Sequence, residues 1–431
     1  MLLTIVIFIL ILSLLVFVHE LGHFLTARRF GVKCEEFGMG LPPRIVGWQL
    51  IKKTGWEKLA EQEQVSVAMA ADELPSGQEL IKETVIRETV EIDTPVTDKS
   101  WRFVWGNREV VKDEPMIYSL NWIPVGGFVK IKGENGEEAG DADSFGHKPV
   151  WQRSVILAAG VTMNVVLCVL LLSLGFAVGM PSAVEDNQGG KFIAPPEVQV
   201  TEILPDMPAV QNDVKLGDII AKVNGAEIAS SQALKENFGQ LVGQTAKLTI
   251  KRNGAQLEKD IAIVQKDGIT GIGIGIMDVG VVRYPLHLAL WQGLKMTWQW
   301  LVLIVLAVVG LVRQLFGGPS VGLDFAGPVG IAVMTGQAAK MGWVYVLQFA
   351  ALLSLNLAII NILPFPALDG GRIMFLLAEK FRGKAVNSKW ENLSHNVGFI
   401  LLMLLIVIIT YRDIIRYGAK IIDALKRGVG L

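Results

Sequence analysis

The chain has 431 residues, of which 51% are hydrophobic and only 19% are charged, and its formal net charge is −1. Soluble domains carry about 25% charged residues, so this composition indicates membrane-spanning helices with soluble inserts between them. A near-neutral charge argues against nucleic-acid binding, which uses a basic face, and two cysteines exclude a disulfide-stapled secreted scaffold.

The first predicted element is a transmembrane helix within residues 1–30. No charged side chain occurs from Met1 to Val18, and about 20 apolar residues suffice to cross a bilayer. A signal peptide is the alternative, but no charged residue precedes the apolar run and no small-residue cleavage site follows it. We therefore expect this helix to be retained.

Residues 31–153 are predicted to form an insert on the cytoplasmic side of the membrane. Its stretch near 50–105 has no role that the sequence assigns. Residues 116–132 (MIYSLNWIPVGGFVKIK) contain two apolar runs around Pro124–Gly127, a pattern that predicts a β-hairpin. The apolar side chains further predict that this hairpin is associated with the membrane.

Three further spans and one soluble domain are predicted along the rest of the chain. The spans are transmembrane helix 2 at 154–180, helix 3 within 341–384, and helix 4 within 394–431, which ends in an amphipathic tail. Short alternating strands with one helix predict a compact α+β domain at 195–278. The expected fold is an α-helical membrane protein with four core transmembrane helices, a membrane-associated β-hairpin and this domain.

Basic residues beside the spans predict their orientation. Arg28 and Arg29 follow the first span, and Lys148 and Arg153 precede the second. These ends are therefore expected in the cytoplasm, with the N-terminus and residues 181–340 outside. A further basic cluster after the fourth span disagrees with this orientation, but the first helices usually determine it.

The sequence HELGH at 19–23 is the strongest chemical signal in the chain. On a helix, His19 and His23 share one face at a spacing that lets both imidazoles reach one zinc ion, and Glu20 can take a proton from a zinc-bound water. The short pattern also occurs without function. Here it lies in an apolar helix, where ionisable residues are costly and by default functional, so a zinc site is predicted.

A catalytic zinc usually takes three protein ligands, and Asp369 is the predicted third. It lies in NILPFPALDGGR at 361–372, where two prolines break the helix and two glycines allow close backbone approach. An ordinary turn with an aspartate cap is the alternative. The expected position of Asp369 at the cytoplasmic end of its span, the same side as His19, favours the metal.

A shared metal constrains the apolar stretch at 298–312. If that stretch crossed the membrane completely, Asp369 would emerge on the side opposite His19. We therefore predict that residues 285–340 contain an interfacial or re-entrant helical segment. Hydrophobicity alone would favour an ordinary span.

Several motifs together resemble those of the site-2 proteases, the M50 zinc intramembrane metalloproteases, and among them the regulator of sigma-E protease group. Each motif alone is weak, and their shared order over nearly the whole chain carries the resemblance. The motifs are HELGH at 19–23, FGMGLPP at 37–43, YSLNWIPVGGFVKIKGE at 118–134, WQRSVILAAGVTMN at 151–164, AGPVGIA at 326–332 and NILPFPALDGGR at 361–372.

The resemblance implies roles for individual residues. Zn²⁺ would be bound by His19, His23 and Asp369, and Glu20 would activate the water. Substrate would be held by Asn361 near the active site and by the hairpin at 116–132, which would present it as an added strand and includes Gly126, Gly127 and Phe128. The domain at 195–278 would be a PDZ domain whose loop Gly271, Ile272 and Gly273 binds peptide ends.

The resemblance also implies regulated intramembrane proteolysis in a bacterial inner membrane. Substrates would be single-span proteins already shortened outside by another protease, such as anti-sigma factors or remnant signal peptides. Two alternatives remain. A non-catalytic peptide-binding scaffold would have no need to retain Glu20, and a zinc channel or transporter would distribute polar residues along several spans, whereas here they lie at one depth.

Overall fold

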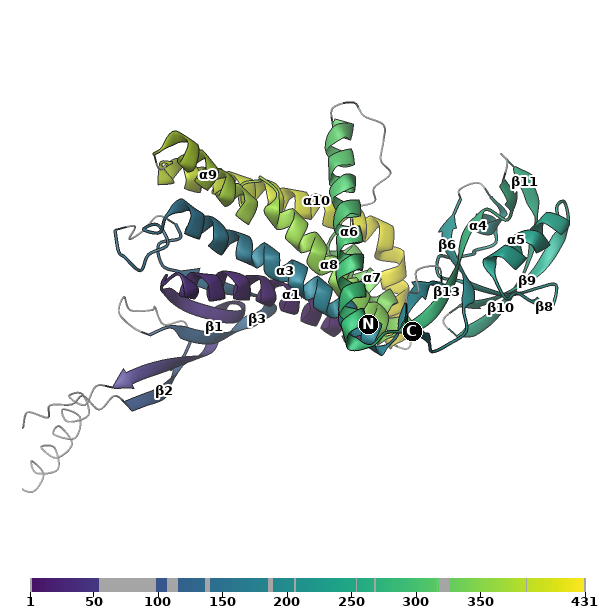
Figure 1. The fold of residues 1–431 in the computed structure, drawn as a ribbon, viewed down its shortest axis with the longest axis horizontal. Coiled ribbons are helices and arrows are strands. Elements are labelled where there is room, and N and C mark those ends of the chain that lie inside the picture. The colour runs from purple at the N-terminus through teal and green to yellow at the C-terminus, as the bar shows by residue number, and fades with distance from the viewer. Residues whose placement is uncertain are drawn as a thin grey trace, which may run out of the picture. The chain divides into compact units, whose positions relative to one another are not determined.

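The computed structural model describes residues 2–53, 98–106, 115–135, 140–184, 189–204, 207–252, 254–266, 269–315, 317, 326–384 and 386–429. Most of the stretch near 50–105, to which the sequence assigns no role, lies outside these residues. The chain divides into two compact units, one of residues 12–156 and one of residues 1–11 with 157–431. Figure 1 labels the elements of both units.

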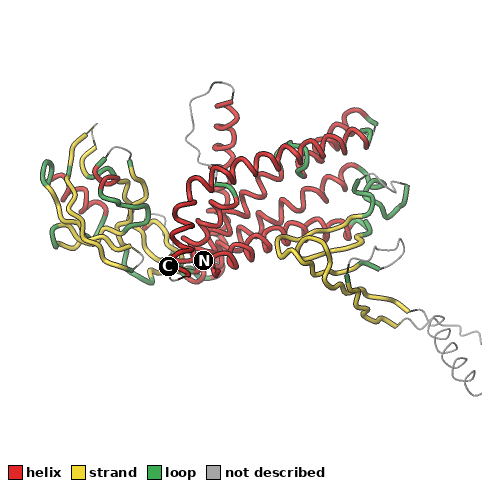
Figure 2. The backbone as a smooth tube through the Cα atoms, turned by 180° about the vertical axis from the view of Figure 1, so that it is seen from behind, coloured by secondary structure: helices red, strands yellow, loops and turns green. Residues whose placement is uncertain are grey.

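The unit of residues 12–156 combines helix with one three-stranded sheet. It contains most of α1 (Leu2–Arg29) and the start of α3 (Val150–Val178). Between them lie β1 (Cys34–Lys53), β2 (Asp98–Trp105) and β3 (Ile117–Ile131), in the sheet order β2-β1-β3. In Figure 2 the strands of this unit are yellow and its helices are red.

The strand pairing within this sheet is interlocked, which means that a segment of β1 lies between two segments of β3. Phe37 of β1 pairs with Val129 on one side and with Tyr118 on the other, and Tyr118 in turn pairs with Trp48, which pairs with Phe103 of β2. Both β1 and β3 therefore bend and contribute two segments each. Residues 127–131 form one edge of the resulting sheet.

The prediction of a hairpin at 116–132 is wrong in its pairing. The two apolar runs do not pair with each other at this point, because Phe37 lies between Tyr118 and Val129. The turn around Pro124–Gly127 does reverse the chain, as expected. Alternating apolar residues and turn residues predict that a segment is a strand. They do not predict its partner, which here is a segment of β1 about 80 positions earlier in the chain and depends on long-range packing.

Aromatic and glycine contacts hold this sheet against α1. Phe24 stacks on Phe37 with ring centroids 4.7 Å apart, and the Ser13 hydroxyl donates to the Pro124 carbonyl at 2.8 Å. At Gly127 an added Cβ would lie 2.9 Å from the Gly38 carbonyl oxygen and 3.4 Å from the backbone of α1. Glycine at position 127 therefore lets β3 lie this close to the Gly38 carbonyl of β1.

The second unit contains the remaining long helices. These are α6 (Leu286–Leu315), α7 (Pro328–Met341), α8 (Trp343–Ile362), α9 (Asp369–Arg382) and α10 (Ser388–Val429). Five helices among the described residues are long and apolar enough to cross a membrane, namely α1, α3, α6, α8 and α10. Because α6 is one continuous helix rather than only the stretch 298–312, its interfacial or re-entrant placement stays a prediction.

Small and hydroxyl-bearing residues mediate the contacts among these helices. The Ser354 hydroxyl of α8 donates to the Asn164 carbonyl of α3 at 2.8 Å, and both residues are fully buried. Thr297 of α6 lies 3.5 Å from the Cys168 sulfur of α3. Such interhelical bonds and small contact residues are typical of helices that pack in a membrane.

The soluble part of this unit is an eight-stranded sheet with two short helices. Its strands follow the order β10-β9-β7-β6-β13-β4, with β5 beside β13 and β8 beside β7, and β11 and β12 form a separate pair. The bounds are β4 (Met180–Ala183), β5 (Lys191–Phe192), β6 (Glu197–Ile203), α4 (Pro208–Gln211), β7 (Ile219–Val223), β8 (Ala226–Glu227), α5 (Ser231–Gln240), β9 (Thr245–Arg252), β10 (Ala255–Ala262), β11 (Val264–Lys266), β12 (Ile269–Gly271) and β13 (Ile274–Arg283).

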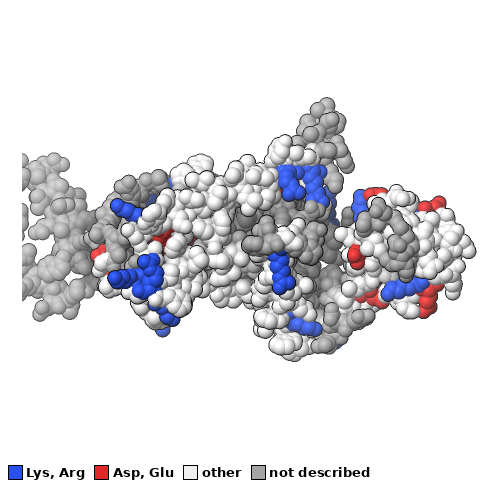
Figure 3. All heavy atoms as spheres, turned by 90° about the horizontal axis from the view of Figure 1, so that it is seen from above, with Lys and Arg blue, Asp and Glu red and all other residues white. Residues whose placement is uncertain are grey.

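One hydrophobic core stabilises this domain. It includes Ile220, Leu234, Leu248 and Ile250, all fully buried. Beside it, the guanidinium of Arg252 donates to both oxygens of Asp218 at 2.7 Å. The outer surface carries charges of both signs, visible at the right of Figure 3. The sheet extends beyond the predicted bounds of 195–278 through β4, β5 and the end of β13.

A buried carboxylate joins α10 to the start of α7. Asp413 is only 4% exposed, and it accepts a hydrogen bond of 2.6 Å from the Gly330 N–H in the first turn of α7. The N-cap residue Gly327 has no side chain that could do this. An added Cβ at Gly327 would lie 2.6 Å from Ile409 and 2.9 Å from Asp413. The AGPVGIA motif at 326–332 therefore serves close packing and capping of α7.

Replacing Asp413 by alanine should loosen the start of α7. We expect a loss of about 1 kcal/mol in stability, the usual cost of removing a helix cap, and faster hydrogen exchange of the first-turn amides. Mass-spectrometric hydrogen exchange on the full chain in detergent measures both local and global effects. Arg412→Ala, at the exposed neighbouring position, is the control. Equal protection of α7 in both variants would contradict this role.

Candidate metal centre

Two imidazoles meet on one face of α1. His19 and His23 are each 6% exposed, and their Nε2 atoms lie 3.1 Å apart. The uninterrupted apolar run favours a straight helix here, and residues four apart then lie one above the other. Two ligands of a tetrahedral zinc at about 2.0–2.1 Å lie about 3.4 Å from each other. The observed separation fits such an ion.

The backbone of α3 orients the second imidazole. His23 Nδ1 lies 2.9 Å from the Ile156 carbonyl oxygen. Because a carbonyl oxygen only accepts, Nδ1 carries the proton and Nε2 keeps its lone pair, directed towards His19. Metal-binding histidines commonly donate their second ring N–H in this way, which fixes the tautomer and increases the basicity of the ligand nitrogen.

Glu20 lies at the edge of the interlocked sheet. Its Oε2 accepts a hydrogen bond of 3.2 Å from the Val129 N–H. Val129 pairs with Phe37 on its other side, so this N–H belongs to the outer edge of the sheet. The structure therefore places the carboxylate of HELGH beside a strand edge within the same unit.

Asp369 lies in the other unit, as the first residue of α9. The preceding loop is tightly bonded: Phe365 N–H donates to the Leu363 carbonyl at 2.7 Å, and Ala367 N–H donates to His395 Nδ1 at 2.9 Å. Ala367 has a φ of 80°, an unusual value for a residue other than glycine. Asp369 is half-buried, as is Asn361 near the end of α8.

Three glycines leave no room for side chains around this loop. An added Cβ would lie 2.2 Å from the Ile362 oxygen at Gly370, 2.3 Å from the Phe365 oxygen at Gly371 and 2.4 Å from the Pro366 oxygen at Gly398. Real Cβ atoms do not approach backbone oxygens so closely. The DGG sequence therefore fixes the path of the chain directly after Asp369.

The other predicted substrate-binding residues divide between two places. Gly126, Gly127 and Phe128 lie in β3 beside α1, in the same unit as Glu20. Gly271 and Gly273 have φ values of 138° and 82° and flank Ile272 in the soluble domain. The Ile272 side chain is fully buried in the core and its carbonyl accepts from Ala209 N–H, so this side chain packs the domain rather than facing a peptide.

The sequence shows no partner for His395, which the structure places against the loop before Asp369. It comes from α10, 28 positions after the Ala367 N–H that it accepts. The only sequence signal is that histidine is rare, with five in the chain. No local pattern links His395 to the loop before Asp369.

Comparisons with known proteins show the family of this chain. The sequence model of peptidase family M50 matches residues 7–60 and 109–405. The regulator of sigma-W protease RasP from Bacillus subtilis (strain 168) is 30% identical over 445 residues, covering 96% of this chain and 98% of that protein. The zinc metalloprotease RasP from Shouchella clausii (strain KSM-K16) is 28% identical, covering 95% and 98%.

Among solved structures, the PDZ domain of an SdrC-like protein from Listeria innocua is similar to part of the chain. The two are 30% identical, and the match covers 19% of this chain and 92% of that domain, with a TM-score of 0.17.

Replacing Gly371 by alanine should disrupt the loop before α9. The added Cβ would contact the Phe365 oxygen at 2.3 Å, so the backbone has to shift at the position of Asp369. We expect the zinc content per purified chain to fall, measured by atomic absorption. Gly418→Ala in α10 is the matched control, since no atom lies within 4 Å of its added Cβ. Full zinc content in Gly371→Ala would contradict the prediction.

Proposed function

The chain belongs to peptidase family M50 and is a multi-pass membrane protein and a zinc metalloprotease, and from this we propose that it cleaves peptide bonds within membrane-spanning segments. The observation that carries the proposal is the position of Glu20, beside two buried imidazoles of an apolar helix and at the edge of a sheet. Cleavage of a peptide bond within the membrane needs a metal, a general base and a site for extended backbone at the same depth in the membrane.

We propose His19, His23 and Asp369 as the zinc ligands. The two histidines support this through their burial, their converging Nε2 atoms and the bond that fixes the His23 tautomer. Asp369 supports it through its place at a tightly built helix start that admits no side chain at the next two positions. Two imidazoles and one carboxylate are a known set for a catalytic zinc with one open position.

Glu20 is the proposed general base. Zinc, when bound, lowers the pKa of a bound water towards about 7 and polarises the scissile carbonyl. The Val129 N–H holds Oε2 of Glu20. The carboxylate then takes the proton of the attacking water and delivers it to the leaving amine.

Residues 127–131 are the proposed site of the substrate strand. A helix hides its peptide bonds, so cleavage requires a segment to unwind, and pairing along a strand edge replaces the hydrogen bonds that are lost. Two observations support this edge: it borders the sheet on the side away from Phe37, and it runs beside Glu20. Gly126 and Gly127 then act by keeping the strand against α1, with Phe128 beside them. Asn361 is proposed to position the substrate.

The domain at 195–278 is proposed to be a PDZ domain that binds peptide ends of trimmed substrates. Residues 274–279 of β13 pair with β6, whereas β4 pairs only with residues 279–282. Among the described residues, no strand pairs with the second edge of residues 274–278. Helix α5 lies beside this edge, where Ser231 donates to Asp278. The backbone of Gly271 and Gly273 would lie at the end of this edge.

The proposed substrates are single-span membrane proteins already shortened outside, such as anti-sigma factors or remnant signal peptides. This assignment places the active site near the cytoplasmic side of a bacterial plasma membrane and the domain at 195–278 on the outer side. It also requires that α6 does not cross the membrane completely, because Asp369 would then lie on the side opposite His19. The proposed membrane core therefore has four transmembrane helices. The basic residues at the end of α1 support this orientation.

Metal analysis tests the ligand set. We expect about one zinc per wild-type chain and a large loss in His23→Ala and in Asp369→Ala, because a site with two remaining ligands binds zinc weakly. His287→Ala removes an exposed imidazole at the start of α6 and is the control. Zinc retained at the wild-type level in Asp369→Ala would show that the third ligand is a different residue.

Replacing Glu20 by glutamine separates an enzyme from a scaffold. Cleavage of a single-span reporter should fall by about 10²–10⁴, the usual contribution of a general base, while zinc content stays unchanged. Reporter cleavage in reconstituted vesicles and metal analysis on the same preparation measure both. Unchanged cleavage would contradict the role of Glu20, and loss of zinc together with activity would assign Glu20 to metal binding instead.

A further inference from the structure

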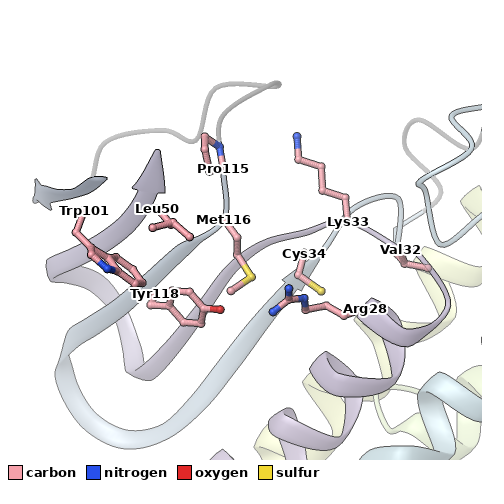
Figure 4. Close-up of a pocket in the computed structure, with 9 residues that line it drawn as sticks. All are labelled: Arg28, Val32, Lys33, Cys34, Leu50, Trp101, Pro115, Met116 and Tyr118. Atoms are coloured by element: carbon pink, nitrogen blue, oxygen red, sulfur yellow. The ribbon is translucent and has the colours of Figure 1, made fainter. Parts of the chain in front are cut away.

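Figure 4 shows a cavity of about 370 Å³ in the unit of residues 12–156, where the end of α1 meets β1, β2 and β3. The Arg28 guanidinium and the Tyr118 hydroxyl face one another across it, whereas the Lys33 side chain extends away from both. The polar groups of this cavity therefore do not converge on one point. In the other unit, by contrast, contacts of α10 do converge, on the loop that leads into Asp369.

The imidazole of His395 in α10 holds the backbone of this loop. Its Nδ1 accepts a hydrogen bond from the Ala367 N–H at 2.9 Å. A backbone N–H only donates, so Nδ1 carries a lone pair and the neutral ring has its proton on Nε2. Nε2 is buried and has no hydrogen-bond partner within the described part of the chain. His395 therefore acts on the loop as a hydrogen-bond acceptor, through Nδ1.

The backbone at Ala367 has a conformation that needs such support. Its φ of 80° lies in the region that residues other than glycine rarely adopt. A residue keeps a conformation of this kind only where the surrounding structure holds it. The neighbouring Pro364 and Pro366 have no N–H that could help to hold the loop. The bond to His395 therefore stabilises the strained residue directly.

The strained residue lies very close to the proposed metal ligand, because only Leu368 separates Ala367 from Asp369. Leu368 is the N-cap of α9, and its side chain makes no capping hydrogen bond. The direction in which the chain enters α9 at Asp369 therefore depends on the backbone at Ala367.

Packing on both sides of Asp369 keeps His395 in place. Gly398, one turn further along α10, lets this helix lie against the loop, since an added Cβ there would lie 2.6 Å from the Pro366 Cβ. After Asp369, the Phe375 ring of α9 lies 5.7 Å from the His395 imidazole, measured between ring centroids. His395 thus contacts both the loop before the carboxylate and the helix after it.

We propose that His395 is a positioning residue for Asp369. By holding the Ala367 N–H, it fixes the path of the loop and with it the position of the Asp369 carboxylate. This inference rests on the proposed role of Asp369 as a zinc ligand. Residues that orient a metal ligand without touching the metal contribute to its affinity, so loss of this bond weakens the metal site although all three proposed ligands remain.

Two substitutions of nearly equal shape separate the hydrogen bond from the bulk of the ring. In His395→Asn, Oδ1 takes the place of Nδ1 and still accepts, whereas His395→Leu has no acceptor. The zinc affinity of the full chain in detergent is measured by competition with a chelator. We expect it to fall by about tenfold in His395→Leu and to stay within about twofold of the wild type in His395→Asn.

Cobalt(II) bound in place of zinc gives a second measurement. Its visible absorption bands depend on the geometry of the ligands, which a purely structural loss of stability does not change in the chains that stay folded. The bands should shift in His395→Leu and remain as in the wild type in His395→Asn.

Asn396→Leu is the matched control, because it exchanges the same two side-chain shapes at the next, exposed position of α10. It should bind zinc as the wild type does. Equal losses of zinc affinity in His395→Asn and His395→Leu would overturn the proposal, because the ring rather than its acceptor would then matter. An equal loss in Asn396→Leu would also overturn it, since any change in this turn of α10 would have the same effect.

Asp369→Ala, measured alongside, distinguishes this proposal from the ligand set on which it rests. Wild-type zinc affinity in His395→Leu, together with a large loss in Asp369→Ala, would overturn the positioning role and leave the ligand set intact. Zinc retained in Asp369→Ala would overturn both.

Discussion

The placement of three polar side chains, His19, Glu20 and His23, in an apolar helix is the constraint on which this structure depends. Such groups are costly in a membrane unless each meets a partner. The Ile156 carbonyl meets His23 and the Val129 N–H meets Glu20. The first bond brings HELGH against α3, and the second brings it against the edge of the sheet.

The features that the sequence predicts well are those encoded locally. The helices at 2–29, 150–178 and 343–362 follow from uninterrupted apolar runs, and the family followed from short motifs in a fixed order and is confirmed by the comparisons. The zinc cofactor is confirmed in the same way, whereas its three ligands stay predictions. The hairpin failed because alternation predicts a strand but carries no information about its partner. Phe37 lies between Tyr118 and Val129, and this pairing can be seen only in the folded chain.

The contacts that the sequence could not show are long-range and use common residue types. His395 accepts from Ala367, and Asp413 accepts from Gly330 across 83 positions. Both partners are backbone N–H groups, which every residue except proline has, so no sequence pattern marks them. Both bonds lie beside glycines that admit no Cβ, at Gly398 and Gly327. Close-approach glycines therefore indicate where α10 is held, although they do not name the side chain that holds it.

The interlocked sheet links the edge at Glu20 to the strands around it. Tyr118 pairs with Phe37, and Phe37 pairs with Val129, whose N–H donates to Glu20. Paired strands share backbone hydrogen bonds, so they keep a common register. The position of the edge strand beside Glu20 is therefore fixed by the pairing of the whole sheet. The bent paths of β1 and β3 make this connection short, because only one strand segment separates Tyr118 from Val129.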